Sequence, residues 1–208
     1  MNVLCFASQK GGSGKSTLAG SLAVAARQAS ERVVVVDLDP QGSLAEWGRI
    51  REPKDIVFRE VEPSALPRWL AETRKVKAVS LVILDTAGTF GPEVDTALKQ
   101  SDFTLVPVRP SALDLRAARP TVERLKSLKR PFGFVLNATN PITQARTADA
   151  LAALGAGGLV APPVADRTDF RDAAASGLGV VEINPTGKAA AEIAALWVWT
   201  KQQMESLT

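Results

Sequence analysis

Histidine and tyrosine are absent from this 208-residue chain, and cysteine occurs once, as Cys5. Without histidine, imidazole acid–base catalysis and histidine-ligated metal sites are excluded. A single cysteine excludes an intrachain disulfide and any site that needs several thiolates, and we expect Cys5 to be a small core residue. No apolar run approaches the ~20 residues of a membrane-spanning helix, and the first residues do not form a signal-peptide pattern. We therefore expect a cytoplasmic protein.

The composition is otherwise ordinary for a globular protein, with 46% hydrophobic and 23% charged residues. The length suits one domain, since single cores commonly reach ~150–250 residues. The net charge is only +3, but residues 99–130 hold an excess of basic side chains. This segment contains Lys99, Arg109, Arg116, Arg119, Arg124, Lys126, Lys129 and Arg130 against Asp102, Asp114 and Glu123. Such a segment attracts nucleic acid or is a solvated helix face, and composition leaves both readings open.

A glycine-rich stretch, Lys10-Gly-Gly-Ser-Gly-Lys-Ser-Thr17, follows an apolar run at 3–7 and precedes a helix-like segment at 18–28. A strand, a glycine turn and a helix form the context of a phosphate-binding loop. Glycines let backbone N–H groups converge on phosphate oxygens, and the helix N-terminus and Lys15 add positive charge. The hydroxyl of Ser16 is placed to bind Mg²⁺. The alternative, a chance glycine–lysine turn, does not explain this flanking context.

Carboxylates follow two other apolar segments. The run 32–36 precedes Asp37 and Asp39, and the run 81–84 precedes Asp85. Strands that are apolar on both faces are typical of parallel sheets covered by helices, and such sheets bind ligands beyond the carboxyl ends of their strands. Asp85 therefore has the position of a Walker B aspartate, which orients a water on Mg²⁺; a turn aspartate is the alternative. Ser43 is expected to cap a short helix over 43–47.

The remaining pattern alternates strands with helices. We expect strands at 56–61, 103–108, 132–136 and 159–161, with extended backbone at 180–181. Helices are expected at 64–74, 92–100, 111–128 with an interruption near Pro120, 143–154, 168–175 and 187–206. The glycine-containing loop 86–92 is expected to respond to a γ-phosphate. Together these elements predict an α/β fold, one domain over 1–208 with a doubly wound, mostly parallel sheet.

Several motifs, in order, resemble the ParA/MinD superfamily of ATPases with a deviant Walker A loop. They are KGGSGKST at 10–17, VVVVDLDPQGS at 33–43, LVILDTAG at 81–88, FTLVPVRPSALDL at 103–115 and DRTDFRDAAASGLGVVE at 166–182. The common loop begins with glycine where this chain has Gln9, and a second lysine, Lys10, precedes the loop lysine Lys15. This pair of lysines is the feature that resembles the deviant loop. The chain departs from the family where Ala87 and Gly88 replace the usual D-x-P-P prolines. The match covers nearly the whole chain.

The resemblance implies an ATPase that uses ATP and Mg²⁺. The phosphates would lie on Gly11, Gly12, Ser13, Gly14, Lys15 and Thr17, the metal site would use Ser16, Asp37 and Asp85, and Asn137 would contact adenine. Asp39 would position the attacking water. Lys10 would neutralise the nucleotide of a partner subunit, so hydrolysis would depend on an ATP-bound homodimer. Catalysis of this kind is mainly positioning and charge neutralisation, which makes Lys10, Lys15 and Asp39 the expected catalytic residues.

Within the superfamily, the sequence is most similar to a small ParA-type protein. Iron–sulfur relatives need paired cysteines, and the bacterial tyrosine kinases of this fold need a tyrosine-rich tail. The chain has one cysteine and no tyrosine, so both classes are excluded. A MinD-like protein would end in a basic amphipathic helix, whereas residues 194–201 are apolar nearly all round and predict a core helix without a stable membrane anchor. Because the chain begins at its first strand, we expect no helix-turn-helix and no sequence-specific DNA recognition.

The ParA resemblance implies non-specific DNA binding, a nucleoid-associated location and a ParB-like or cargo-adaptor partner. Arg146, Arg167 and Arg171 are the candidate DNA contacts, and Lys126, Lys129 and Arg130 form a further candidate patch. The cargo would be a plasmid, a chromosome or a protein assembly. Two alternatives stay open: a metabolic ATP-dependent enzyme similar to dethiobiotin synthetase, and a MinD-like membrane-associated positioning ATPase.

Overall fold

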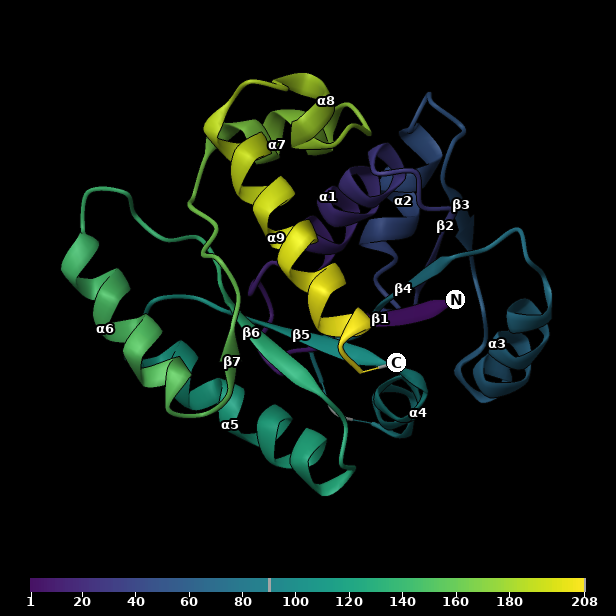
Figure 1. Cartoon of the computed structure of the whole chain (residues 1–208), viewed down its shortest axis with the longest axis horizontal. Coiled ribbons are helices and arrows are strands. Elements are labelled where there is room, and N and C mark those ends of the chain that lie inside the picture. The colour runs from purple at the N-terminus through teal and green to yellow at the C-terminus, as the bar shows by residue number, and fades with distance from the viewer. Residues whose placement is uncertain (90, 208) are drawn as a thin grey trace.

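The computed structural model describes residues 1–89 and 91–207 and contains one seven-stranded sheet with the order β3-β2-β4-β1-β5-β6-β7 (Figure 1). Every pairing between neighbouring strands is parallel. The strands are β1 (Asn2–Phe6), β2 (Val33–Asp37), β3 (Val57–Arg59), β4 (Leu81–Asp85), β5 (Phe103–Val108), β6 (Phe132–Leu136) and β7 (Leu159–Val160). The predicted α/β fold with a doubly wound parallel sheet is therefore confirmed.

Helices connect the strands and cover both faces of the sheet. They are α1 (Lys15–Gln28), α2 (Ser43–Ile50), a 3₁₀ turn (Pro63–Ala65), α3 (Leu66–Lys75), α4 (Pro92–Gln100), α5 (Ala112–Ser127), α6 (Gln144–Gly155), α7 (Thr168–Ala175), α8 (Val180–Ile183) and α9 (Lys188–Glu205). Side chains alternate between the two faces of each strand, so each central strand contributes to two cores. One core packs under α1, α2 and α7–α9, and the other packs under α3–α6.

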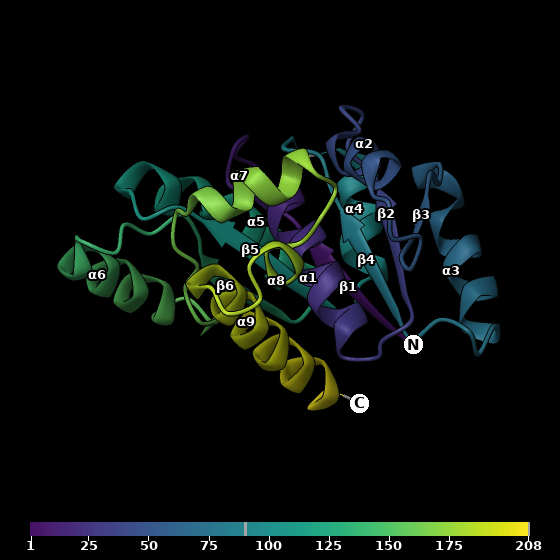
Figure 2. The same cartoon turned by 90° about the horizontal axis from the view of Figure 1, so that it is seen from above.

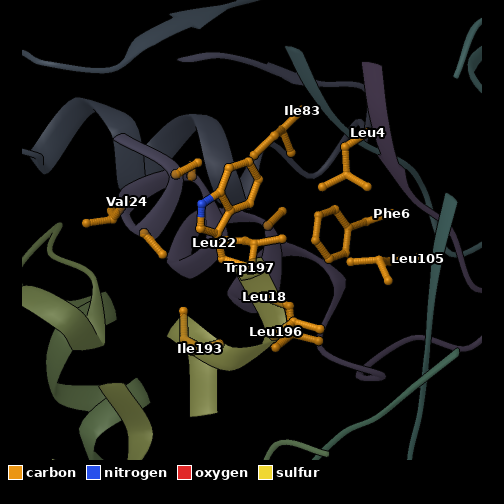
Figure 3. Packing of buried hydrophobic residues seen from close by; sticks show 14 of the residues in the cluster. Leu4, Phe6, Leu18, Leu22, Val24, Ile83, Leu105, Ile193, Leu196 and Trp197 are labelled. Atoms are coloured by element: carbon orange, nitrogen blue, oxygen red, sulfur yellow. The ribbon is translucent and has the colours of Figure 1, made fainter. Parts of the chain in front are cut away.

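The C-terminal helix α9 packs beside α1 on the same side of the sheet (Figures 1 and 2). Ile193, Leu196 and Trp197 are buried, and Figure 3 shows them against side chains of α1 and the central strands. Fully burying an aliphatic side chain contributes about 1.5–3 kcal/mol, which explains why an apolar C-terminal segment folds onto the core. The prediction of a core-packing helix is confirmed. None of the helices in residues 1–89 and 91–207 is long and apolar enough to cross a membrane.

Three local predictions were wrong. Val180 and Val181 are the first residues of helix α8 rather than extended backbone; the Glu182 carboxylate accepts a hydrogen bond from the Gly179 amide and both valines are buried. Tertiary burial here outweighs the preference of β-branched residues for strands. Pro120 does not interrupt α5, because its ring is exposed while Leu125 and its neighbours anchor the helix to the sheet.

The third error concerns the start of α2. Ser43 is the first helical residue rather than the cap, and Gly42 occupies the cap position in a left-handed conformation with φ 63°. A remote side chain caps the helix instead: Oδ2 of Asp37 accepts hydrogen bonds from the amides of Leu44 (3.0 Å) and Ala45 (2.9 Å). The end of β2 thereby fixes the start of α2.

Candidate nucleotide site

A cavity of about 760 Å³ opens beyond the carboxyl ends of β1, β2 and β4. This is the edge at which parallel α/β sheets bind ligands, and the volume lies in the ~300–1,000 Å³ range of small-molecule sites. Its walls come from three segments that are distant in sequence: the phosphate loop, the loop after β2 and the loop after β4. The lining residues are Gln9, Gly11, Gly12, Gly14, Lys15, Ser16, Thr17, Asp39, Pro40, Gln41, Ser43, Ala87, Gly88 and Thr89.

The phosphate loop has the geometry of an anion cradle. Gly12 and Gly14 have φ values of 74° and 96°, which favour glycine, and α1 begins directly after Gly14. The backbone amides of residues 11–17 have no acceptor among the described residues. Lys15 is 7% exposed and forms no hydrogen bond or ion pair within the described part of the chain. A buried ammonium is costly unless an anion or water binds it, and a row of free N–H groups at a helix N-terminus is a ready anion-binding site.

Asn137, at the end of β6, contacts the phosphate loop. Its Nδ2 donates a hydrogen bond of 2.8 Å to the carbonyl of Ser13. A Cβ atom at Gly14 would lie 2.1 Å from that nitrogen, so the close approach requires glycine as well as the positive φ. In this structure Asn137 therefore fixes the backbone of the phosphate loop at Ser13. Its predicted contact with adenine stays a prediction.

The two aspartates after β2 have different surroundings. Both oxygens of Asp37 are engaged: Oδ1 accepts from the Asp39 amide at 3.0 Å, and Oδ2 caps α2. The Oδ1 atom of Asp39 accepts from the Gln41 amide at 3.0 Å, and its side chain lines the cavity. Asp39 is therefore placed to hold a water molecule in the cavity. Asp37 supports the loop after β2, and its predicted place in the metal site stays a prediction.

Asp85, at the end of β4, is fully buried, and neither carboxylate oxygen has a hydrogen-bond partner within the described residues. Burial raises its pKa to about 7, and the adjacent Asp37 carboxylate adds to the rise; nearby Ser16 and Lys15 offset part of it. Two buried oxygens without partners need a water or a cation. No group of three acidic, histidine or cysteine side chains able to hold a metal occurs in residues 1–89 and 91–207. A Mg²⁺ ion that keeps several waters and phosphate oxygens fits Ser16 and Asp85.

The loop after β4 is tied to β1 at its start. The Thr86 hydroxyl donates a 2.8 Å hydrogen bond to the carbonyl of Phe6. A Cβ atom at Gly88 would lie 3.5 Å from the Gly11 amide and 3.7 Å from Nζ of Lys15, so Gly88 lies against the phosphate loop. This arrangement fits the predicted response to a γ-phosphate, which the structure does not test. Phe90, within the predicted loop, lies outside the described residues.

Lys10 turns away from the cavity and contacts α5 of its own chain. Its Nζ lies 2.6 Å from Oδ1 of Asp114, and Asp114 also accepts a hydrogen bond from the Ser111 hydroxyl at the start of α5. Burial alone would raise the pKa of Asp114, but the bonds from Lys10 and Ser111 outweigh it and lower the pKa. Sequence reasoning missed this pair. Ser111 and Asp114 do form an S-x-x-D helix-start pattern, but nothing in it points to Lys10.

The three predicted DNA contacts lie outside the cavity. Arg146 on α6 and Arg171 on α7 are exposed; Arg171 lies 4.0 Å from Asp166, and Arg146 forms no ion pair among the described residues. Arg167 is different, because its guanidinium forms a 2.5 Å ion pair with Glu192 of α9 and its side chain is 20% exposed. This pair leaves Arg167 fewer free donors than the other two arginines.

The profile of one protein family, described as the CobQ/CobB/MinD/ParA nucleotide binding domain, matches residues 4–180. The chain belongs to this family. Among curated proteins, it is 29% identical to "Maintenance of carboxysome distribution protein A" of Halothiobacillus neapolitanus, with 91% of each chain aligned. The corresponding protein of Gloeobacter kilaueensis is 39% identical over 59% of this chain and 56% of its own length. "Protein ParA" of Rhizobium radiobacter is 36% identical over 55% of this chain and 51% of its own length.

Solved structures of the family share the fold. MinD in the MinC:MinD complex of Aquifex aeolicus superposes with a TM-score of 0.84 at 16% identity, covering 97% of this chain and 96% of that one. The MinD protein of Pyrococcus horikoshii with Mg-ADP gives 0.82 at 14% identity, covering 100% and 98%. The Cyanothece apo McdA structure gives 0.76 at 16% identity, covering 94% and 98%. At these identities the likeness establishes the fold alone.

Proposed function

We propose that this protein is a Mg²⁺-dependent ATPase that dimerises on ATP, binds DNA non-specifically and positions or partitions a cargo. The observation that supports the ATPase part is the buried Lys15 beside the amides of residues 11–17, none of which has a partner in the described part of the chain. Such a cradle favours binding of a polyphosphate or comparable anion. Asp39 in the wall of the same cavity supplies the group that a hydrolase needs and a binding module does not.

Each residue of the site has a defined task in this proposal. The loop amides and Lys15 hold the phosphates and neutralise the charge that develops on the leaving group. Asp39 orients the attacking water, and Asp37 keeps Asp39 in place through the 3.0 Å bond to its amide. Ser16 and Asp85 would hold Mg²⁺, which neutralises phosphate charge when it is bound. Little covalent chemistry is required of the protein, so positioning dominates.

A homodimer completes the site in this proposal. Lys10 would leave Asp114 and reach the nucleotide of the partner subunit, so that ATP binding and dimerisation depend on one another. Arg146 and Arg171, with Arg167 once its ion pair with Glu192 opens, would contact DNA phosphates on the dimer. A ParB-like or adaptor protein would stimulate hydrolysis and release the dimer from the nucleoid. The printed names of the carboxysome-distribution and ParA relatives support a positioning or partition role.

The decisive experiment measures binding to a short duplex of arbitrary sequence with no nucleotide, with ADP and with ATP, across a salt series. The Asp39→Ala protein is used so that bound ATP persists. We expect tight binding only with ATP and Mg²⁺, falling steeply as salt rises. Absence of binding in every state would overturn the DNA-scaffold reading and favour a small-molecule substrate or a membrane surface.

The same assay tests the DNA contacts individually. Arg146→Ala, Arg167→Ala and Arg171→Ala should each weaken binding and lower the salt slope by roughly one unit. Arg68→Ala, at an exposed arginine of α3, is the matched control and should leave the slope unchanged. Slopes that are unchanged for all three variants would put the DNA surface elsewhere on the molecule.

A further inference from the structure

Helices α5 and α6, at the lower left in Figure 1, enclose a groove of about 330 Å³ that no part of the proposed ATPase cycle uses. Its floor is apolar. Phe134 of β6 and Leu154 of α6 are buried beneath it, and Leu115 and Val122 of α5 contribute half-buried side chains. Leu115 and Val122 are seven residues apart, so they lie on one face of the helix, two turns apart. Covering an open apolar groove of this kind with another apolar surface is favourable, because it removes apolar area from water.

The rim of the groove is positively charged. Arg116, Arg119 and Lys126 line it and are exposed, and their side chains form no ion pair or hydrogen bond within residues 1–89 and 91–207. Glu123 is the one acidic residue among those that line the groove. On the same helix, by contrast, Arg124 pairs with Asp95 of α4. The groove therefore combines an apolar floor with cations that have no partner among the described residues.

This combination distinguishes the possible occupants. Nucleic acid would pair its phosphates with the three cations but would leave Leu115, Val122 and Phe134 without a complementary surface. A purely solvated helix face would not need a groove. An amphipathic peptide helix satisfies both features, because it places apolar anchors at i, i+3 or i+4 and i+7 in the groove and carries carboxylates along its flanks.

We propose that the α5–α6 groove binds an acidic amphipathic helical segment of a partner protein. The apolar residues of that segment enter the groove over Phe134, and its Asp and Glu side chains pair with Arg116, Arg119 and Lys126. The groove lies away from the nucleotide cavity, with which it shares no lining residue. This inference does not rest on the proposed ATPase function, because binding can be measured without nucleotide.

The test is a selection from a library of random 16-residue peptides displayed on phage against the full, nucleotide-free protein. We expect enriched peptides with net negative charge and Leu, Ile, Phe or Trp at helical spacing. An enriched peptide is then synthesised and its affinity measured by fluorescence anisotropy. The R116E/R119E/K126E variant should weaken its binding by at least tenfold. R68E/K77E/K188E makes the same change of charge at exposed sites outside the groove and should stay within twofold of the original protein.

A second variant tests the floor without changing charge. Ala153 of α6 is exposed and lines the groove, so Ala153→Trp fills the space with little risk to folding and should abolish peptide binding. Enrichment of neutral or basic peptides, or no enrichment, would overturn the proposal. The proposal is also overturned if R116E/R119E/K126E and Ala153→Trp bind the selected peptide as tightly as the control R68E/K77E/K188E. Loss of duplex DNA binding in R116E/R119E/K126E, with no peptide selected, would instead assign the surface to nucleic acid.

Discussion

If the protein dimerises on ATP as proposed, Asp114→Asn should strengthen the dimer, because Asp114 holds the lysine that would reach the nucleotide of the partner subunit. Nζ of Lys10 lies 2.6 Å from Oδ1 of Asp114 within one chain, and dimerisation as proposed requires Lys10 to leave. Asparagine keeps the shape of the side chain and can still bond with Ser111 at the start of α5. The substitution therefore removes mainly the charge that retains Lys10.

The expected size of the effect follows from the burial of the two partners. An ion pair between exposed side chains contributes about 0–1 kcal/mol. The Lys10 side chain is 41% exposed and that of Asp114 is 9% exposed, so partial shielding puts this pair at about 1 kcal/mol. Each dimer breaks two such pairs. Removing them should lower the free energy of dimerisation by about 2 kcal/mol and tighten the dimer Kd by roughly 30-fold.

Sedimentation equilibrium measures this Kd directly, with ATP and Mg²⁺ and with Asp39→Ala in every protein to prevent turnover. Asp95→Asn is the matched control: it also removes one negative charge from an ion pair, with Arg124, but on the α4–α5 surface. Its dimer Kd should stay within twofold. An unchanged or weaker dimer in Asp114→Asn would refute the competition, and would mean that Lys10 does not leave Asp114 on dimerisation.

Further predictions concern nucleotide binding, acid stability and one buried ion network. Lys15→Ala should abolish ATP binding in calorimetry, and ordinary affinity would remove the phosphate-loop assignment. Because the pKa of Asp114 is lowered in the folded protein, its ion pair should contribute fully to stability above about pH 4–5 and be lost as the pH falls further. The free energies of unfolding of wild type and Asp114→Asn, measured in urea, should then converge in acid. A constant difference between them down to pH 3 would contradict this. Glu182→Ala should lower the free energy of unfolding by about 2–3 kcal/mol and Tm by about 4–9 °C, because Asp55 is then the one carboxylate partner left to the 1% exposed Arg51 among the described residues. Differential scanning calorimetry measures this change. A decrease in the free energy of unfolding below about 0.5 kcal/mol would show that Asp55 alone suffices to pair the buried Arg51.

Much of the site could be predicted because its chemistry lies in consecutive residues. The glycines, Lys15 and Ser16 occupy adjacent positions, so the conformation of one turn brings them together. Asp39 and Asp85 follow apolar runs, and parallel strands align their carboxyl ends at one edge. The structure places the two strands side by side, and their register pairs Asp37 with Asp85 directly. The same local logic predicted the doubly wound sheet and the burial of α9.

Other features depended on contacts between distant segments, which no local pattern encodes. Asn137 bonds to Ser13 across 124 residues, and Arg51 to Glu182 across 131. Burial against α1 turned Val180 and Val181 into helix, and Asp37 replaced Ser43 as the cap of α2. The interruption expected at Pro120 did not occur, because the helix holds its place through the opposite, buried face. At Val180, Val181 and Ser43 tertiary packing outweighed a local preference of about 1 kcal/mol or less, and at Pro120 it outweighed a helix-interior cost of about 3 kcal/mol.

The sequence by itself determined which residues gather at the candidate nucleotide cavity, because adjacent residues and strand ends are joined by short-range geometry. Only the tertiary structure decided how those residues are held: Lys10 by Asp114, the phosphate loop by Asn137, and Asp39 by Asp37. It also decided that Phe134 lies beneath the cationic groove of α5 and α6. The physical reason is that charge pairing and apolar burial act between whatever surfaces the fold brings together, regardless of their separation along the chain.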